Sequence, residues 1–165
     1  MDGLERFSEA QDDERGGQEV ALEELRQGRK RGHWIWYVFP QLAGLGVSET
    51  SRRFGIRGPD EARAYLRDAT LHDRLSSAVQ VVVDQVRRAP PPRLEHLLGS
   101  RIGAQKLVSS LTLFEHVAAE LHARDGDEAH ARLAAQAREV LAVAESQGYE
   151  RCAFTLRQLG IGPST

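Results

Sequence analysis

Three long stretches carry apolar residues at helical spacing, and this periodicity is the strongest constraint on how the chain folds. In residues 70–89 the apolar positions recur every three or four residues: Leu71, Leu75, Val79, Val82 and Val86. Similar stripes run through 102–124 and 128–147. Such a stripe forms one face of an amphipathic helix and must be buried against other elements. The pattern predicts an all-α fold, a compact multihelical domain with a helix-bundle core.

The same stripes predict which side chains form the core and where the helices end. The predicted core positions are Leu75, Val79, Val82, Leu107, Leu111 and Phe114. Three prolines at 90–92 end the first helix, a turn at 125–127 separates the other two, and Gly148 ends the third. We expect one domain over 1–165, with a polar hinge at 12–17 and a loose tail at 160–165.

Shorter elements are indicated around these helices. We expect a short helix near 20–25 that stops close to Gly28, one capped by Ser48 and one that begins at Pro59. A last short helix is expected within 151–159. Residues 33–39 are ambiguous, because their β-branched and aromatic content favours a strand while no partner strand is evident.

Composition narrows the classes of protein. A net charge of -2 and a pI near 6.3 argue against a dedicated nucleic-acid binder. The single cysteine, Cys152, allows no internal disulfide, which favours a cytoplasmic location, and we expect a monomer. No apolar run approaches the roughly 20 residues of a membrane span. The six histidines show no ligand spacing, so neither a metal nor a cofactor is expected.

A basic and aromatic block is the first candidate site. Arg29, Lys30 and Arg31 precede His33, and Trp34 and Trp36 follow it. Cations can hold an anion such as a phosphate, and aromatic rings can stack a flat group. Alternatively, the cations form a solvated face and the aromatics belong to the core.

Residues after this block add to its interest. Gly32, Gly44 and Gly46 permit close backbone approach, either to a ligand or to another chain segment. The side-chain amide of Gln41, which follows Pro40, can donate one hydrogen bond and accept another, and can so recognise a ligand group that does both.

The second candidate is the segment that contains Lys106, Ser109 and Ser110. On a helix, Lys106 and Ser110 lie on neighbouring turns of one face. A buried lysine beside a serine can act as a base, although the order is the reverse of the usual Ser-x-x-Lys signature. The alternative is that the two serines are small residues that allow close helix packing. Cys152 is interpreted as a small buried hydrophobe.

Several blocks resemble the domain of unknown function 1810 family. They are residues 7–11, 21–41, 44–48, 61–66 and 106–114, and the most specific is the His-Trp-x-Trp segment that ends in Phe-Pro-Gln. The resemblance runs from Leu4 to about Leu159. It implies a compact, mostly helical single domain with no settled activity. Members are sometimes labelled calpastatin-like, but calpastatin segments are disordered, unlike these amphipathic helices.

The chain departs from the family pattern in two places. Residues 12–17 look like an insertion, and Gly103 stands where relatives often have an acid. The family signature is rich in polar and aromatic residues: Gln11, Lys30, His33, Trp34, Trp36, Gln41, Lys106, Ser109, Ser110 and Thr112. A fold that needed only a core has little use for such a set, so the resemblance favours a site.

We therefore expect a pocket for a small anionic, nucleotide-like ligand. Its walls would be Trp34, Trp36, Gln41, Ser109 and Ser110. Lys30 and Lys106 would hold the anion, and His33 would serve as general acid or base. We expect His33 and Lys106 to converge there, with Glu24 or an external anion as partner of the lysine. A protein-interaction module with an exposed aromatic patch is the alternative, and nucleic-acid binding is a weaker third hypothesis.

Overall fold

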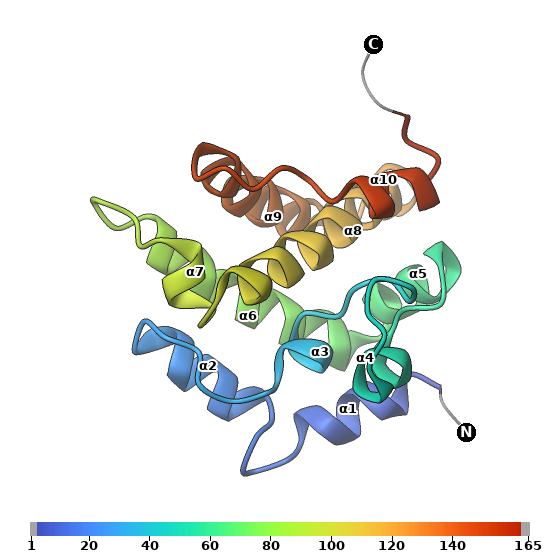
Figure 1. Cartoon of the computed structure of the whole chain (residues 1–165). Helices are drawn as coiled ribbons and strands as arrows, with labels where there is room; N and C mark the ends of the chain where they lie inside the picture. The colour runs from blue at the N-terminus through green and yellow to red at the C-terminus, as the bar shows by residue number, and fades with distance from the viewer. Residues whose placement is uncertain (1–2, 163–165) are drawn as a thin grey trace.

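The computed structural model describes residues 3–162, which form ten helices and no strand, so the predicted all-α class is confirmed. Figure 1 shows their arrangement. The helices are α1 (Glu5–Gln11), α2 (Gln18–Arg26), α3 (Ile35–Val38), α4 (Glu49–Phe54), α5 (Pro59–Arg67), α6 (Ala69–Val86), α7 (Leu94–Leu97), α8 (Arg101–Asp125), α9 (Glu128–Ser146) and α10 (Ala153–Gln158).

Helix α8 crosses the middle of the molecule, and most other elements pack on it (Figure 1). It forms a hairpin with α9 through Gly126, whose φ of +71° is the left-handed conformation that glycine adopts readily. Asp127 then caps α9 by accepting a hydrogen bond from the backbone N–H of Ala129. Helices α5, α7 and α10 also contact α8, while α6 packs against α9 and α2.

The three predicted long helices correspond to α6, α8 and α9, with ends that differ by at most three residues. All six predicted core side chains are buried. The helices expected after Ser48 and Pro59 are present as α4 and α5, and Ser48 Oγ accepts from the backbone N–H of Ser51. Of the expected tail at 160–165, residues 163–165 lie outside the described residues.

The strand reading of residues 33–39 is wrong, because the segment contains the short helix α3. Trp34, Ile35, Val38 and Phe39 are buried, and their spacing is that of one helix face. Beta-branched and aromatic residues are enriched in strands because they fit a half-buried surface, and here one helical turn offers them that surface. Within residues 3–162, extended pairing is limited to a single parallel bridge between Leu42 and Ile56.

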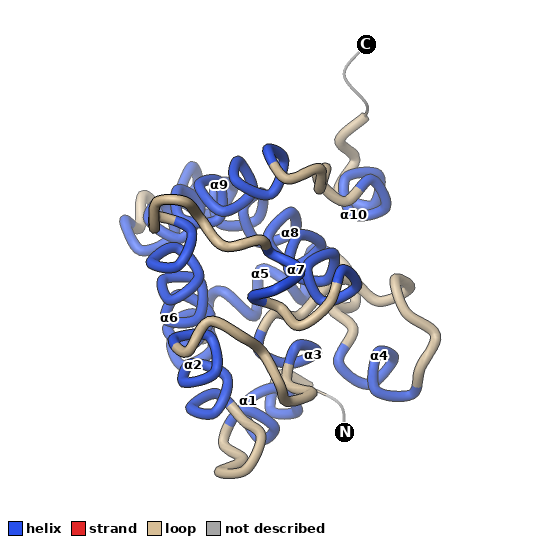
Figure 2. Tube along the Cα trace, turned by 60° about the vertical axis from the view of Figure 1, so that its left-hand side comes forward, coloured by secondary structure: helices blue, strands red, loops and turns tan. Residues whose placement is uncertain are grey.

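A view turned by 60° shows how the N-terminal helices join the rest (Figure 2). Helix α1 was not predicted from the sequence. Its Arg6 is buried and donates to Glu61 Oε1 at 2.6 Å and to the backbone oxygen of Gly55 at 2.9 Å. These contacts tie α1 to the start of α5. Of the helices in residues 3–162, none combines the length and apolar character needed to cross a bilayer.

We expect Leu111→Ala to lower the free energy of unfolding by about 2–5 kcal/mol, since Leu111 is fully buried in α8 and its truncation leaves a cavity. Chemical denaturation measures this. Val47→Ala serves as the control, because Val47 is 86% exposed and its truncation should change stability by less than about 0.5 kcal/mol. A cost below about 0.5 kcal/mol for Leu111→Ala would contradict the packing of α8.

Candidate functional site

Glu24 of α2 organises the loop that carries the basic and aromatic block. One carboxylate oxygen, Oε1, accepts from the backbone N–H groups of Arg31 at 2.8 Å and Gly32 at 2.9 Å, and from Trp34 Nε1 at 2.8 Å. Burial would raise the pKa of Glu24, but these bonds and the charge of Lys30 outweigh it and lower that pKa. The carboxylate therefore fixes Trp34 in the core, where the ring is fully buried.

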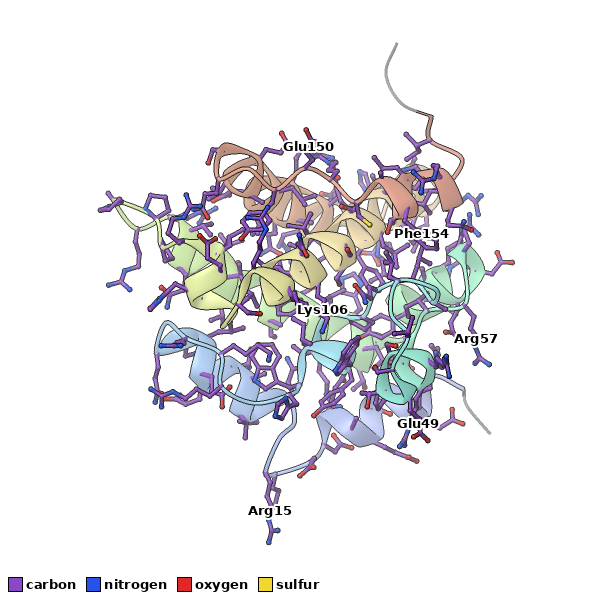
Figure 3. All side chains as sticks on the ribbon, viewed as in Figure 1. Arg15, Glu49, Arg57, Lys106, Glu150 and Phe154 are labelled. Atoms are coloured by element: carbon purple, nitrogen blue, oxygen red, sulfur yellow. The ribbon has the colours of Figure 1, made fainter. Side chains whose placement is uncertain are left out.

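Lys106 of α8 lies over the ring of Trp36 from α3, with 3.7 Å between Nζ and the ring centroid. Figure 3 shows Lys106 between these two helices. Among the described residues, the ammonium has neither a hydrogen-bond partner nor a carboxylate within ion-pair distance; its contact is the ring face. Burial lowers the pKa of Lys106 below its ordinary value. The site thus holds a partly desolvated cation without a counter-ion.

Lys30 adds a second cation close to the first. Its Nζ donates to the backbone oxygen of Gly32 and lies 5.3 Å from the centroid of the Trp34 ring. Burial lowers the pKa of Lys30, the charge of Lys106 lowers it further, and Glu24 opposes both. Because Glu24 already accepts three N–H groups, it compensates this pair of charges only in part. The local excess of positive charge favours an anion.

A pocket of about 190 Å³ lies beside Lys106 and Trp36; we call it the Lys106 pocket. It is lined by Trp36, Gln41, Leu45, Gly46, Ile102, Gln105, Lys106 and Ser109. Position 46 requires glycine, because a Cβ there would lie 2.7 Å from the side chain of Ser51. The absence of that Cβ lets the 45–47 loop pass close to α4. Four predicted site residues, Trp36, Gln41, Lys106 and Ser109, therefore surround one hollow.

The other predicted site residues lie elsewhere. Trp34 and Ser110 are fully buried, and the hydroxyl of Ser110 has no hydrogen-bond partner among the described residues. His33 is exposed and is not among the residues that line the Lys106 pocket. Its convergence with Lys106 stays a prediction. Lys30 does not line the pocket either, but it lies close enough to Lys106 to lower its own pKa.

Gly103, where relatives often carry an acid, faces the main chain. A Cβ at this position would lie 2.4 Å from the backbone oxygen of Leu98, so this backbone leaves no room for a side chain. The residue is buried and is not part of the pocket lining. Gly103 therefore contributes no group to the Lys106 pocket.

A second pocket, of about 360 Å³, shares Gln105 and Ser109 with the Lys106 pocket. Its lining also includes Arg101, Val108, Gly148, Tyr149, Glu150, Arg151, Cys152 and Ala153. This second pocket was not predicted from the sequence. The polar residues Arg101, Gln105 and Ser109, spaced by four along α8, were a usable signal. The irregular segment 148–153 offered none, because its place beside α8 depends on tertiary packing.

A third hollow, of about 730 Å³, lies at the start of α6 and the turn before α9. Here the rings of His72 and His130 have centroids 5.0 Å apart, and His130 Nε2 lies 3.6 Å from Asp125 Oδ2. Burial lowers the pKa of His130, and the nearby His72 lowers it further. This hollow is the largest of the three, but it shares no lining residue with the other two. Across residues 3–162, no three His, Cys, Asp or Glu side chains are placed to hold a metal.

Comparison with known proteins gives a family and a fold but no activity. A family model described as a protein of unknown function, DUF1810, matches residues 1–143. The chain is 35% identical to the conserved hypothetical protein Rv1873 from Mycobacterium tuberculosis, whose crystal structure it matches with a TM-score of 0.75. That match covers 96% of this chain and 97% of the other. No curated protein shows significant similarity to the chain.

We expect Glu24→Ala to destabilise the protein by about 1–3 kcal/mol, because it leaves three N–H donors without their charged acceptor. Denaturation followed by tryptophan fluorescence measures both stability and the environment of Trp34. Glu23→Ala is the matched control, since the exposed Glu23 bonds only with Gln27 on its own helix. Equal, small effects of the two substitutions would show that Glu24 does not organise the loop.

Proposed function

The chain belongs to the DUF1810 family of proteins of unknown function, and we propose that it binds a small anionic, nucleotide-like ligand in the Lys106 pocket. Lys106 and Lys30 hold the anionic group, and the pocket wall orients it. The first role assigned is binding, because the residues around the pocket supply cations and hydrogen-bonding groups. A reaction at this site would need an acid or base in addition.

The observation that carries the proposal is the position of the Lys106 ammonium. It is partly desolvated, rests on the Trp36 ring and has no carboxylate partner in residues 3–162. A cation–π contact contributes about 0.5–2 kcal/mol, whereas an unpaired charge away from water costs more. A lysine with only a structural role is expected to lie in solvent or beside an acid. An anion from outside the chain supplies the missing counter-charge.

The pocket wall offers hydrogen-bonding groups around this cation. The amide of Gln41 has no side-chain partner among the described residues, so its N–H groups are free to donate. The hydroxyl of Ser109 donates to the backbone oxygen of Gln105 at 3.0 Å and keeps its lone pairs available. A volume of about 190 Å³ suits one phosphate or carboxylate group, since pockets for whole small-molecule ligands measure roughly 300–1,000 Å³. The rest of the ligand therefore extends beyond this pocket.

The alternative, a protein-interaction module with an exposed aromatic patch, has less support. Trp34 and Phe39 are 0% and 1% exposed, and Trp36 and Tyr37 are partly buried. An interaction patch needs a contiguous exposed apolar surface, which this block does not offer.

The role of His33 as acid or base stays a prediction. We expect His33→Ala to remove ligand binding or turnover while leaving the melting temperature nearly unchanged.

Lys106→Gln tests the proposal directly. We expect the wild-type protein to bind ADP, measured by isothermal titration calorimetry, and the variant to bind it at least about tenfold more weakly, a loss of about 1.4 kcal/mol. Arg29→Gln is the control, because Arg29 belongs to the exposed cationic run and does not line the pocket. Equal losses in the two variants would indicate general surface charge. Failure of the wild-type protein to bind ADP, AMP or inorganic phosphate would refute the proposal.

The pH dependence of binding provides an independent test. The anion requires the charged form of Lys106, and burial lowers the pKa of that group below 10.5. Affinity for ADP should therefore be full at neutral pH and fall as the pH rises through this lowered pKa. Calorimetry between about pH 7 and about pH 10 measures the loss, since it should begin before an ordinary lysine deprotonates. A flat profile over this range would contradict a role for Lys106.

A further inference from the structure

The exposed face of α8 joins the Lys106 pocket to the second pocket. Gln105 and Ser109 line both hollows, so these two side chains form a shared floor. One wall consists of α3 and the loop around Leu45, and the other is the 148–153 segment. Figure 3 labels Lys106 on this helix and Glu150 on the segment that forms the second wall. We call the combined hollow the α8 groove.

A second cation without an ion pair lies in the groove. Arg101 is exposed, and the structure gives its guanidinium no carboxylate partner in the described part of the chain. It lies over the ring of Tyr149, 5.2 Å from the centroid, and the hydroxyl of Tyr149 donates to Glu95 at 2.7 Å. The ring that supports Arg101 is therefore held in place from outside the groove.

The position of Arg101 is unfavourable for its own helix. It is the first residue of α8, at the end where the helix dipole is positive and acidic residues are preferred. Ser100 already caps this end by accepting from the backbone N–H of Gly103. Arg151, in the opposite wall, is neutralised by Glu115 and Glu145. The cations of the groove without an ion pair are thus Lys106, with Lys30 nearby, and Arg101. Glu150, exposed in the second wall, is an acid without an ion pair among the described residues.

We propose that the ligand is a small sugar or nucleoside with two separated phosphate groups, one bound at Lys106 and the other at Arg101. The two residues are five positions apart on α8, about 7.5 Å along the helix axis and about 140° around it, and Gln105 and Ser109 lie between them. The hydroxyl groups of the ligand lie over Gln105 and Ser109, where an amide and a hydroxyl can bond to them. This inference rests on the proposed function and names the substrate class of the same site.

Cys152 provides a built-in reporter for the Arg101 side of the groove. It is the only cysteine of the chain, it is partly exposed, and it lines the second pocket. Burial raises the pKa of its thiol, but the polar groups beside it, the hydroxyls of Ser109 and Thr155 and the backbone N–H groups at the start of α10, outweigh burial and lower that pKa. The thiol should react with iodoacetamide at a measurable rate, and a ligand above it should slow that reaction.

The experiment compares three adenine nucleotides by calorimetry. Adenosine 3′,5′-bisphosphate carries two separated phosphates, ADP carries two adjacent ones, and AMP carries one. We expect the bisphosphate to bind the wild-type protein at least about tenfold more tightly than AMP. Arg101→Gln should remove this preference and leave the affinity for AMP and ADP unchanged, whereas Lys106→Gln should weaken all three. Arg29→Gln is the charge-matched control, and circular dichroism confirms that each variant is folded.

Alkylation of Cys152 gives the second readout. The bisphosphate should slow the reaction with iodoacetamide in the wild-type protein and not in Arg101→Gln, and AMP should protect in neither. If AMP and the bisphosphate bind equally and both depend on Lys106, the two-phosphate inference is overturned and the anion site stands. An equal loss of AMP and bisphosphate affinity in Arg101→Gln would also overturn the inference. If none of the three nucleotides binds, the proposed function itself fails.

Discussion

The structure depends on the burial of α8 around its whole circumference. Every residue from 107 to 114 is buried, so this part of the helix contacts neighbours on all sides. Among the polar side chains of this part, Ser109 and Thr112 donate to backbone oxygens of the helix, whereas the buried hydroxyl of Ser110 has no hydrogen-bond partner among the described residues. Thr112 donates to the backbone oxygen of Val108 at 2.7 Å and accepts from the backbone N–H of Cys152 at 3.2 Å. The buried hydroxyl of Thr112 thus has a hydrogen-bond acceptor on its own helix and also holds the segment that forms one wall of the α8 groove.

The proposed function depends on where this burial ends. Toward its N-terminus, α8 emerges from the core, and Arg101, Ile102 and Gln105 become exposed. The same rigid helix therefore serves as a core element at one end and as the floor of the α8 groove at the other. Groups on a helix anchored in this way keep their spacing, which is what recognition of a ligand with two fixed charges requires. The groove walls come from segments distant in sequence that pack on this helix.

The periodicity of apolar residues predicted the long helices that bury one apolar face. It did not predict elements whose structure depends on a single turn or a single contact. The core positions in α6 and α8 followed from spacing alone. Helix α3 did not, since four residues carry too little periodicity to separate a turn from a strand. For the site, residue types singled out four residues that line the Lys106 pocket, Trp36, Gln41, Lys106 and Ser109, but also Trp34 and Ser110, which are buried in the core. Arg101 was not predicted, and the interpretation of Cys152 as a buried hydrophobe is wrong, since it is partly exposed and lines the second pocket. Both positions depend on the 148–153 segment lying beside α8, a tertiary relation.

The Glu24 carboxylate has a consequence for how sequences of this kind can diverge. Glu24 contacts the backbone of Arg31 and Gly32, so the side chain at position 31 is free to change without loss of those bonds. Its third bond is to the indole of Trp34, and a Cβ at Gly32 would lie 3.0 Å from that ring. Substitutions are therefore tolerated in the exposed cation run. A substitution of Glu24, Gly32 or Trp34, in contrast, requires matching substitutions at the other two positions.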